Sequence, residues 1–263
     1  MNILESIGNT PLEQLKRIPP ENAGRILVKL EMVNPTGSMK DRITRALAGG
    51  PKEMESLLSM IDHLVYATPD VDSTIEVLEK LLGVRAAPGG QHPGWGTRNA
   101  LLSLGPRAYL EIMGPDRSQP EPAQPRPLGI DTLSAPRLVT WVARAEDVQA
   151  VIDNARRHTV DLGELQARSR KKPDGSILTW TMTDPTRDRR GGIVPYFINW
   201  GDSPHPAGGS PKGCRLLSLE AFHPKARDVA DNLKSLGIDL AVSFDPIGLK
   251  AAIDCPKGRV ILE

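Results

Sequence analysis

The pattern of hydrophobic and polar positions divides the chain beyond residue 60 into three similar segments. Each opens with an apolar run typical of a buried strand, at 61–68, 137–143 and 215–222. A helical pattern follows each run, at 70–83, 145–158 and 224–236. Further strand patterns then appear near 98–104 and 107–113, near 176–183 and 193–200, and near 239–244, 248–254 and 258–263. This recurring order predicts three modules of one strand, one helix and two or three strands, at about 61–114, 137–202 and 213–263.

The first helical pattern shows how such a helix should pack. Ile75, Leu78 and Leu82 fall on one face at helical spacing, and Val77 and Leu81 widen that apolar stripe. A helix with one apolar face buries it against a sheet, so we expect the helices to lie outside the strands.

The segments outside the three modules do not show this order of strands and helices. The breaker cluster Ala48–Pro51 separates residues 1–50 from residues 51–60, which read as a short helix or linker before the larger domain, 61–263. Residues 115–136 contain six prolines and are expected to form a loop. The sequence KKPDG at 171–175 is typical of a hairpin turn.

Composition narrows the classes of function. The 263 residues are 39% hydrophobic and 25% charged, as in an ordinary globular protein. The net charge of +1 and the 4% of aromatic residues argue against a nucleic-acid or membrane-surface binder. Two cysteines without CxxC spacing, the lack of an apolar leader and the lack of a long apolar run favour a cytoplasmic protein with reduced thiols.

Four short sequence segments resemble those of a known superfamily. They are IDHLVYATPDVD (61–72), GTRNALLSLG (96–105), RAYLEIMGPD (107–116) and IVPYFINWGDSPHP (193–206). Together they resemble the glyoxalase-like domain of the vicinal oxygen chelate superfamily, over roughly 200 residues. The resemblance implies an α+β fold in which repeated βαβββ modules form curled, cup-like mixed sheets with helices outside. It also implies a divalent metal on the floor of the cup, serving lyase, isomerase or dioxygenase chemistry on a small molecule.

His63 and Glu111 match the positions at which the superfamily places metal ligands, on the first and last strands of a module. Strand alternation puts His63 and Val65 on one face and Asp62 on the other. Glu111 lies between apolar neighbours, where a carboxylate is costly to bury unless it is paired or bound to a metal.

The other modules depart from a full metal site, which needs three or four protein ligands. In the second module, the matching positions carry Val139 or Thr140 and Ile198, with Asn199 beside it, so no strong ligand is offered there. The third module places Glu263 at the position of Glu111, as a possible third ligand.

Three interpretations of His63 and Glu111 therefore stay open. They could hold a divalent metal, form a metal-free substrate site, or be a satisfied buried pair in a cup without catalysis. The corresponding functions are an enzyme, a protein that sequesters a small molecule, and a degenerate fusion protein. An odd number of modules also makes a homodimer plausible.

Other residues could shape a substrate pocket. His92 lies in a Gly/Pro-rich loop, GGQHPGWG, that could close over a cup. Trp95, Arg98 and Asn99 could line the pocket and pair with an anionic substrate, although Trp95 is more simply a loop anchor. His205 precedes a proline and indicates a turn.

The first fifty residues resemble a different family. IGNTPLEQL (7–15) and NPTGSMKDR (34–42) are similar to the beginning of cysteine synthase and its fold-type II pyridoxal-phosphate relatives. The resemblance implies that Lys40 stands where that family forms its Schiff base with the cofactor. The match stops near Ala48, and about 50 residues cannot build a pocket that fixes the cofactor phosphate. We therefore expect a fused strand-and-helix appendage without pyridoxal-phosphate activity.

This expectation has a spectroscopic test. The purified chain, mixed with pyridoxal phosphate, should show no Schiff-base absorbance that depends on Lys40, because no phosphate site holds the cofactor there. Spectra of the wild type and of Lys40→Ala should be the same. An absorbance band present in the wild type and lost in the variant would contradict the prediction.

Overall fold

The computed structural model describes residues 12–14, 27–29, 51–172 and 174–263, and the chain divides into two compact units, Met1–Glu55 and Ser56–Glu263. The first unit contains the strands β1 (Leu12–Gln14) and β2 (Leu27–Lys29). They pair antiparallel, with Leu12 opposite Lys29. Lys40 lies outside the described residues, so its predicted lack of catalysis stays a prediction.

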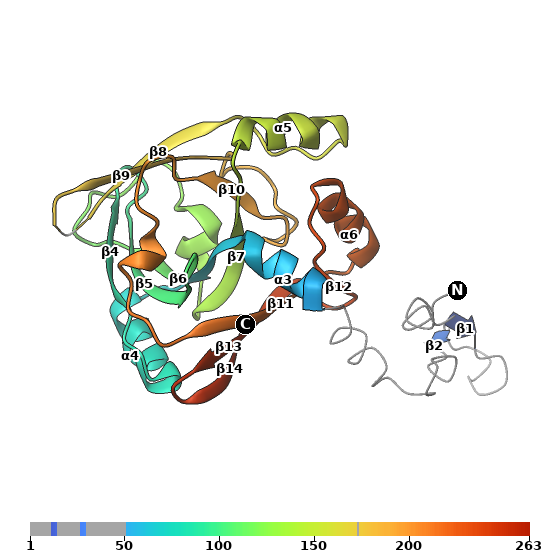
Figure 1. The fold of residues 1–263 in the computed structure, drawn as a ribbon, viewed down its shortest axis with the longest axis horizontal. Helices are drawn as coiled ribbons and strands as arrows, with labels where there is room; N and C mark the ends of the chain where they lie inside the picture. The colour runs from blue at the N-terminus through green and yellow to red at the C-terminus, as the bar shows by residue number, and fades with distance from the viewer. Residues whose placement is uncertain (1–11, 15–26, 30–50, 173) are drawn as a thin grey trace. The chain divides into compact units, whose positions relative to one another are not determined.

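The second unit contains two modules with the same connectivity, preceded by α3 (Pro51–Met60) (Figure 1). The first consists of β3 (Ile61–Ala67), α4 (Val71–Leu82), β4 (Ala87–His92), β5 (Thr97–Gly105) and β6 (Ala108–Pro115). The 3-10 helix η2 (Pro127–Thr132) lies in the connection to the second module. That module consists of β7 (Arg137–Arg144), α5 (Val148–Arg157), β8 (Gln166–Lys171), β9 (Ile177–Met182) and β10 (Tyr196–Asn199).

The eight strands of these modules close into one barrel, in the order β10-β7-β3-β6-β5-β4-β8-β9. In each module the first strand runs parallel to the last, β3 beside β6 and β7 beside β10. The modules join through the antiparallel pair β3–β7 and, on the far side, through β4–β8, where Gln91 lies opposite Lys171. The predicted α+β fold of βαβββ modules in a curled mixed sheet is confirmed.

The third segment has the predicted order of elements but a different pairing. It contains β11 (Arg215–Phe222), α6 (Ala226–Ser235), β12 (Val242–Ser243), β13 (Gly248–Cys255) and β14 (Gly258–Leu262). Its sheet order is β12-β11-β13-β14, so β11 pairs with β13 and not with the last strand. A hydrophobic pattern locates strands without naming their partners, which is why the sequence alone did not separate this sheet from the two barrel modules.

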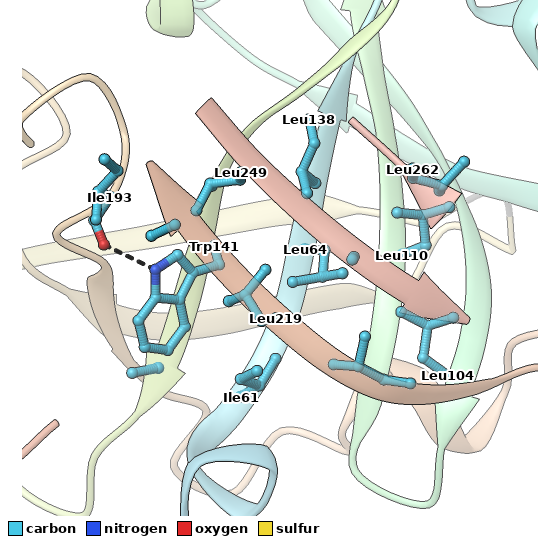
Figure 2. Packing of buried hydrophobic residues seen from close by; sticks show 14 of the residues in the cluster. Ile61, Leu64, Leu104, Leu110, Leu138, Trp141, Ile193, Leu219, Leu249 and Leu262 are labelled. Carbon is cyan, nitrogen blue, oxygen red and sulfur yellow. Dashed lines mark hydrogen bonds between the residues drawn. The ribbon is translucent and has the colours of Figure 1, made fainter. Parts of the chain in front are cut away.

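The main hydrophobic core lies outside the barrel wall. Leu64, Leu110 and Leu138 project from barrel strands toward Leu219 and Leu249 of the four-stranded sheet (Figure 2). A second, smaller cluster fills part of the barrel interior, and it includes Val65, Met113, Val139, Val142, Met182, Tyr196 and Ile198. Alternate residues along each strand therefore face two different environments.

Helix α4 begins and ends at residues suited to those positions. The Asp70 side chain caps the helix by accepting a hydrogen bond from the Ser73 N–H, and Gly83 ends it with a left-handed φ of 79°. Ile75, Leu78 and Leu82 are buried, as predicted. Val77 and Leu81 are 60% and 42% exposed, so the predicted widening of the apolar stripe is wrong. Among the described helices, none is long and apolar enough to cross a membrane.

Two barrel strands are absent from the sequence prediction. The sequence APGGQH of β4 was expected to form part of a flexible loop, and QARSRK of β8 carries no strand pattern. Glycines, a histidine and arginines occupy positions at which a strand usually presents apolar residues to a core. Both strands face the polar part of the barrel interior, so the absence of an apolar pattern has a structural cause.

The core between barrel and sheet can be tested with two leucines. Leu64→Ala should lower the free energy of unfolding by about 2–5 kcal/mol, because Leu64 is fully buried between the two layers. Leu81→Ala is the matched control, and the exposed side chain should cost at most about 0.5 kcal/mol. Urea denaturation measures both. Equal losses would show that the barrel and the sheet do not share this core.

Candidate functional site

Five polar side chains meet inside the barrel and come from five different strands. They are His63 on β3, Glu111 on β6, Asn99 on β5, His92 on β4 and Arg170 on β8. Each is less than one tenth exposed. Buried polar groups of this kind must satisfy one another's hydrogen bonds. Hydrogen bonds within the cluster orient four of its members, and His63 is held from outside it.

Asn99 is the centre of this cluster. Its Oδ1 accepts a hydrogen bond from Arg170 Nη1 at 3.0 Å. Because a guanidinium can only donate, this contact places the amide nitrogen of Asn99 on the other side. That nitrogen donates to Glu111 Oε1 and lies 3.3 Å from His92 Nε2. One asparagine thus joins a cation, a carboxylate and an imidazole.

His92 is held as a neutral ring. Its Nε2 faces the Asn99 donor, and its Nδ1 lies 3.0 Å from Thr97 Oγ1, so the hydrogen belongs on Nδ1. Burial and, to a lesser extent, Arg170 outweigh the opposing effect of Glu111 and lower the pKa of His92 to about 4. The ring is therefore uncharged at neutral pH, with its Nε2 lone pair directed at the Asn99 amide.

A β-bulge determines the orientation of the His63 side chain. Between Ile61 and His63 the register on β7 advances by only one residue, so Asp62 is extra. The bulge breaks the alternation expected from the sequence, and the Asp62 carboxylate accepts a hydrogen bond from His63 Nδ1 at 2.8 Å. The His63 ring also stacks on Tyr109, with ring centroids 4.5 Å apart. Its Nε2 consequently points away from Asp62.

Asp62 is the acceptor for two further side chains. It accepts from His205 Nε2 at 3.0 Å and from Trp200 Nε1 at 3.2 Å. The Ala207 N–H donates to His205 Nδ1, which leaves the ring hydrogen on Nε2. Burial alone would raise the pKa of Asp62, but the hydrogen bonds from His205 and His63 outweigh it and hold the pKa well below its usual range. Asp62 is therefore a carboxylate that anchors both rings.

Two acceptors face each other across a short gap. His63 Nε2 lies 3.6 Å from Glu111 Oε2. Burial would raise the pKa of Glu111, but the neighbouring His63 and His92, the hydrogen bond from Asn99 and the Arg170 guanidinium lower it overall. Glu111 is ionised at neutral pH. A donor group that lies beside this gap can reach either atom.

A cleft of about 1000 Å³ reaches the cluster at His92. Three of the four tryptophans of the chain line it, namely Trp95, Trp180 and Trp200. The Trp180 and Trp200 ring centroids lie 5.1 Å apart, and the Arg168 guanidinium lies 5.1 Å above the Trp95 ring. The size and the aromatic lining are typical of sites for small organic molecules.

The structure brings four predicted residues together and separates two others. His63, His92, Asn99 and Glu111 form the cluster, and Trp95 lines the cleft. Arg98 pairs with Asp72 at 2.7 Å beside a separate hollow of about 700 Å³ at the start of α4. Glu263 follows β14 of the four-stranded sheet, and its exposed side chain pairs with Lys250 at 2.7 Å.

Sequence reasoning did not identify several residues of this site. Asp62 was placed on the opposite face because strand alternation hides a bulge. His205 was taken for a turn residue, although it also reaches Asp62. Arg168 and Arg170 lie on a strand that had no pattern. The alternating arginines of QARSRK are a signal, since two cations at i and i+2 of a strand share one face.

The donors present do not complete a metal site. His63, His92 and Glu111 are metal-binding residue types, but Val139 and Ile198 of the second module belong to the apolar cluster inside the barrel. At the other two matched positions, Thr140 donates to the Gly192 carbonyl and Asn199 donates to the Glu146 carbonyl. Within the described ranges, no group of three or more His, Cys, Asp and Glu is arranged to hold a metal ion. The nearby Arg170 charge also disfavours a second cation.

Comparisons with known proteins identify both parts of the chain. Residues 61–237 match the family model of the glyoxalase-like domain, and residues 3–59 match that of pyridoxal-phosphate dependent enzymes. A crystal structure of a hypothetical protein from Staphylococcus aureus is similar in fold, with a TM-score of 0.54 and 14% identity. The similarity covers 76% of this chain and 83% of that protein.

Curated relatives match the beginning of the chain. Cysteine synthase B of Salmonella typhimurium is 60% identical over 43 residues, which are 16% of this chain and 14% of that enzyme. Cysteine synthase B of Pseudomonas aeruginosa is 53% identical over 71 residues, 25% of this chain and 22% of that enzyme. The chain thus spans less than a quarter of either enzyme. The predicted cysteine-synthase-like fragment is confirmed at this level.

The pKa of His92 predicts a pH dependence of stability. Between pH 6.5 and about 4 the unfolded chain binds a proton at His92 that the folded chain does not, so stability should fall as the pH falls through this window. The expected loss is ~2 kcal/mol between pH 7.5 and pH 5. Urea denaturation of the wild type and His92→Gln at both pH values measures it. A variant with the same pH dependence as the wild type would contradict the assignment.

Proposed function

Because the chain belongs to the family of glyoxalase-like domains, we propose that its barrel binds a small molecule and moves a proton on it without a metal ion. One observation carries the proposal. Two proton acceptors, His63 Nε2 and Glu111 Oε2, face each other at 3.6 Å inside the barrel. His92, which lines the cleft, lies 3.7 Å from Glu111 Oε1, and a pair of acceptors behind it suits general acid–base catalysis.

The proposed proton path uses only groups of the chain. Glu111 Oε2 takes a proton from the bound molecule, and the electron pair of the broken bond stays on that molecule. The proton returns to a neighbouring atom of the molecule from Glu111, or from His63 Nε2 after crossing the gap. The net reaction is an isomerisation, which consumes no other reactant.

The surrounding groups support these roles. Asn99 binds Glu111 Oε1 and leaves Oε2 as the oxygen that faces His63. Asp62 holds the hydrogen of His63 on Nδ1, as an orienting carboxylate does for a catalytic histidine. Burial strengthens the interactions of Glu111 with a bound molecule because little water competes for the carboxylate.

Sequestration of a small molecule without turnover is the second candidate. The interior of the second module favours it, because Val142, Met182 and Ile198 contribute apolar surface and no acid or base. Such a wall gives affinity for an apolar molecule and no chemistry.

Proton exchange in deuterated water tests the proposal. The probe is phenylpyruvate, a carbon acid with adjacent oxygens, and NMR follows the loss of its C3 protons. The chain should accelerate this exchange, and Glu111→Gln should slow it by roughly 10²-fold or more because the base is lost. Glu263→Gln is the matched control, and its rate should equal that of the wild type because the Glu263 side chain is exposed and pairs with Lys250.

Metal dependence is measured on the same samples. Exchange should be unchanged after treatment with a chelator, and elemental analysis should find no stoichiometric ion. An ion that is present in the wild type and absent from His63→Ala would sink the metal-free proposal. Binding of phenylpyruvate without any exchange would favour sequestration, and the absence of both would remove this function.

A further inference from the structure

Two arginines of β8 face the barrel interior from alternate positions. Arg168 lies opposite Trp180 on β9, and Arg170 lies opposite Leu178. Arg170 is only 4% exposed. The Nε atom of each arginine is buried and has no hydrogen-bond partner. Buried guanidinium donors without partners are rare in folded proteins, because each forfeits its hydration.

These arginines also lack acidic partners. Within the described part of the chain, no carboxylate lies within ion-pair distance of either guanidinium. Arg170 donates to the neutral amide of Asn99, and Arg168 Nη2 lies 3.5 Å from Gln166 Oε1. A buried charge without a counter-ion is strongly destabilising, so an anion bound at β8 would relieve that cost.

The carboxylates inside the barrel are engaged elsewhere. Asp62 accepts hydrogen bonds from His63, His205 and Trp200. Glu111 is bound by Asn99 and flanked by the histidines. The β8 wall therefore carries positive charge that no side chain neutralises by direct contact, and Arg168 lines the cleft.

The other walls of the cleft favour a flat molecule. Arg168 lies over the face of Trp95, and Trp180 and Trp200 form a tilted pair at the second module. The Trp200 Nε1–H donates a hydrogen bond to Asp62, and this bond holds the indole ring next to the cluster. Indole rings held in this way present broad apolar faces on which a planar ring can stack.

We infer that the cleft binds a planar small-molecule carboxylate, with the carboxylate on Arg168 and the ring against the Trp180–Trp200 pair. This inference rests on the proposed function and names the substrate class of the same site. The ring and the anionic group are held by β8, β9 and the residues after β10. The remaining end of the molecule is directed toward His92 and the acceptors behind it.

Three probes of graded chemistry test the inference by isothermal titration calorimetry. Naphthalene-2-carboxylate has both the ring and the charge. Naphthalene-2-carboxamide has the same shape without the charge, and cyclohexanecarboxylate has the charge without the aromatic ring. We expect the first to bind at least tenfold more tightly than either of the others, because charge-assisted hydrogen bonds and stacking both contribute.

Variants separate the two contributions. Arg168→Gln should remove the tenfold preference for the carboxylate over the carboxamide, and Trp180→Leu should weaken both naphthalene probes. Arg98→Gln is the control, because Arg98 pairs with Asp72 outside the cluster. It should leave all affinities unchanged. Thermal melting of each variant verifies that it is folded.

The outcomes distinguish this inference from the proposed function. Equal binding of carboxylate and carboxamide, weakened by Trp180→Leu, would overturn the anion site and leave small-molecule binding intact. A preference that survives in Arg168→Gln would also overturn it. If no probe binds and phenylpyruvate exchange is absent, both the inference and the proposed function fall.

Discussion

The buried charge of Glu111 is the constraint on which the rest of the site depends. A carboxylate inside a closed barrel is tolerated only if donors replace the water it has lost. Asn99 supplies one donor, and Arg170 fixes the orientation of Asn99 from across the closure between β4 and β8. Gly89 makes this closure possible, because a Cβ there would lie 2.2 Å from Asn99 Oδ1. The hydrogen bonds that stabilise Glu111 on β6 therefore depend, through Asn99, on Arg170 of β8.

The sequence predicted the fold best where strands bury one apolar face. The first strands of all three segments and the helices between them were found because Leu64, Trp141 and Leu219 follow regular patterns into the shared core. The prediction failed at β4 and β8, whose inward-facing positions carry polar side chains or glycine. Local pattern and global structure disagree there because the strands serve the polar cluster, and such conflicts are expected at functional sites.

The candidate site was predicted in part for the same reason. His63 and Glu111 stood out by resemblance, and His92 and Asn99 by their neighbourhood in the sequence. Asp62 could not be predicted, because a bulge is a property of the pairing between two strands and the sequence of one strand does not display it. The pairing of the third segment was likewise invisible, since Glu263 follows a strand that joins another sheet.

The two modules of the barrel share a connectivity but differ in electrical character. The first contributes the carboxylates Asp62 and Glu111, and the second contributes the guanidinium groups of Arg168 and Arg170. Opposite charges on opposing walls create a field across the interior, and low-dielectric surroundings keep it from being screened. A dipolar molecule entering this space experiences a torque before it makes any contact. The two halves are therefore no longer interchangeable, and a dipolar molecule in this interior would have one favoured orientation.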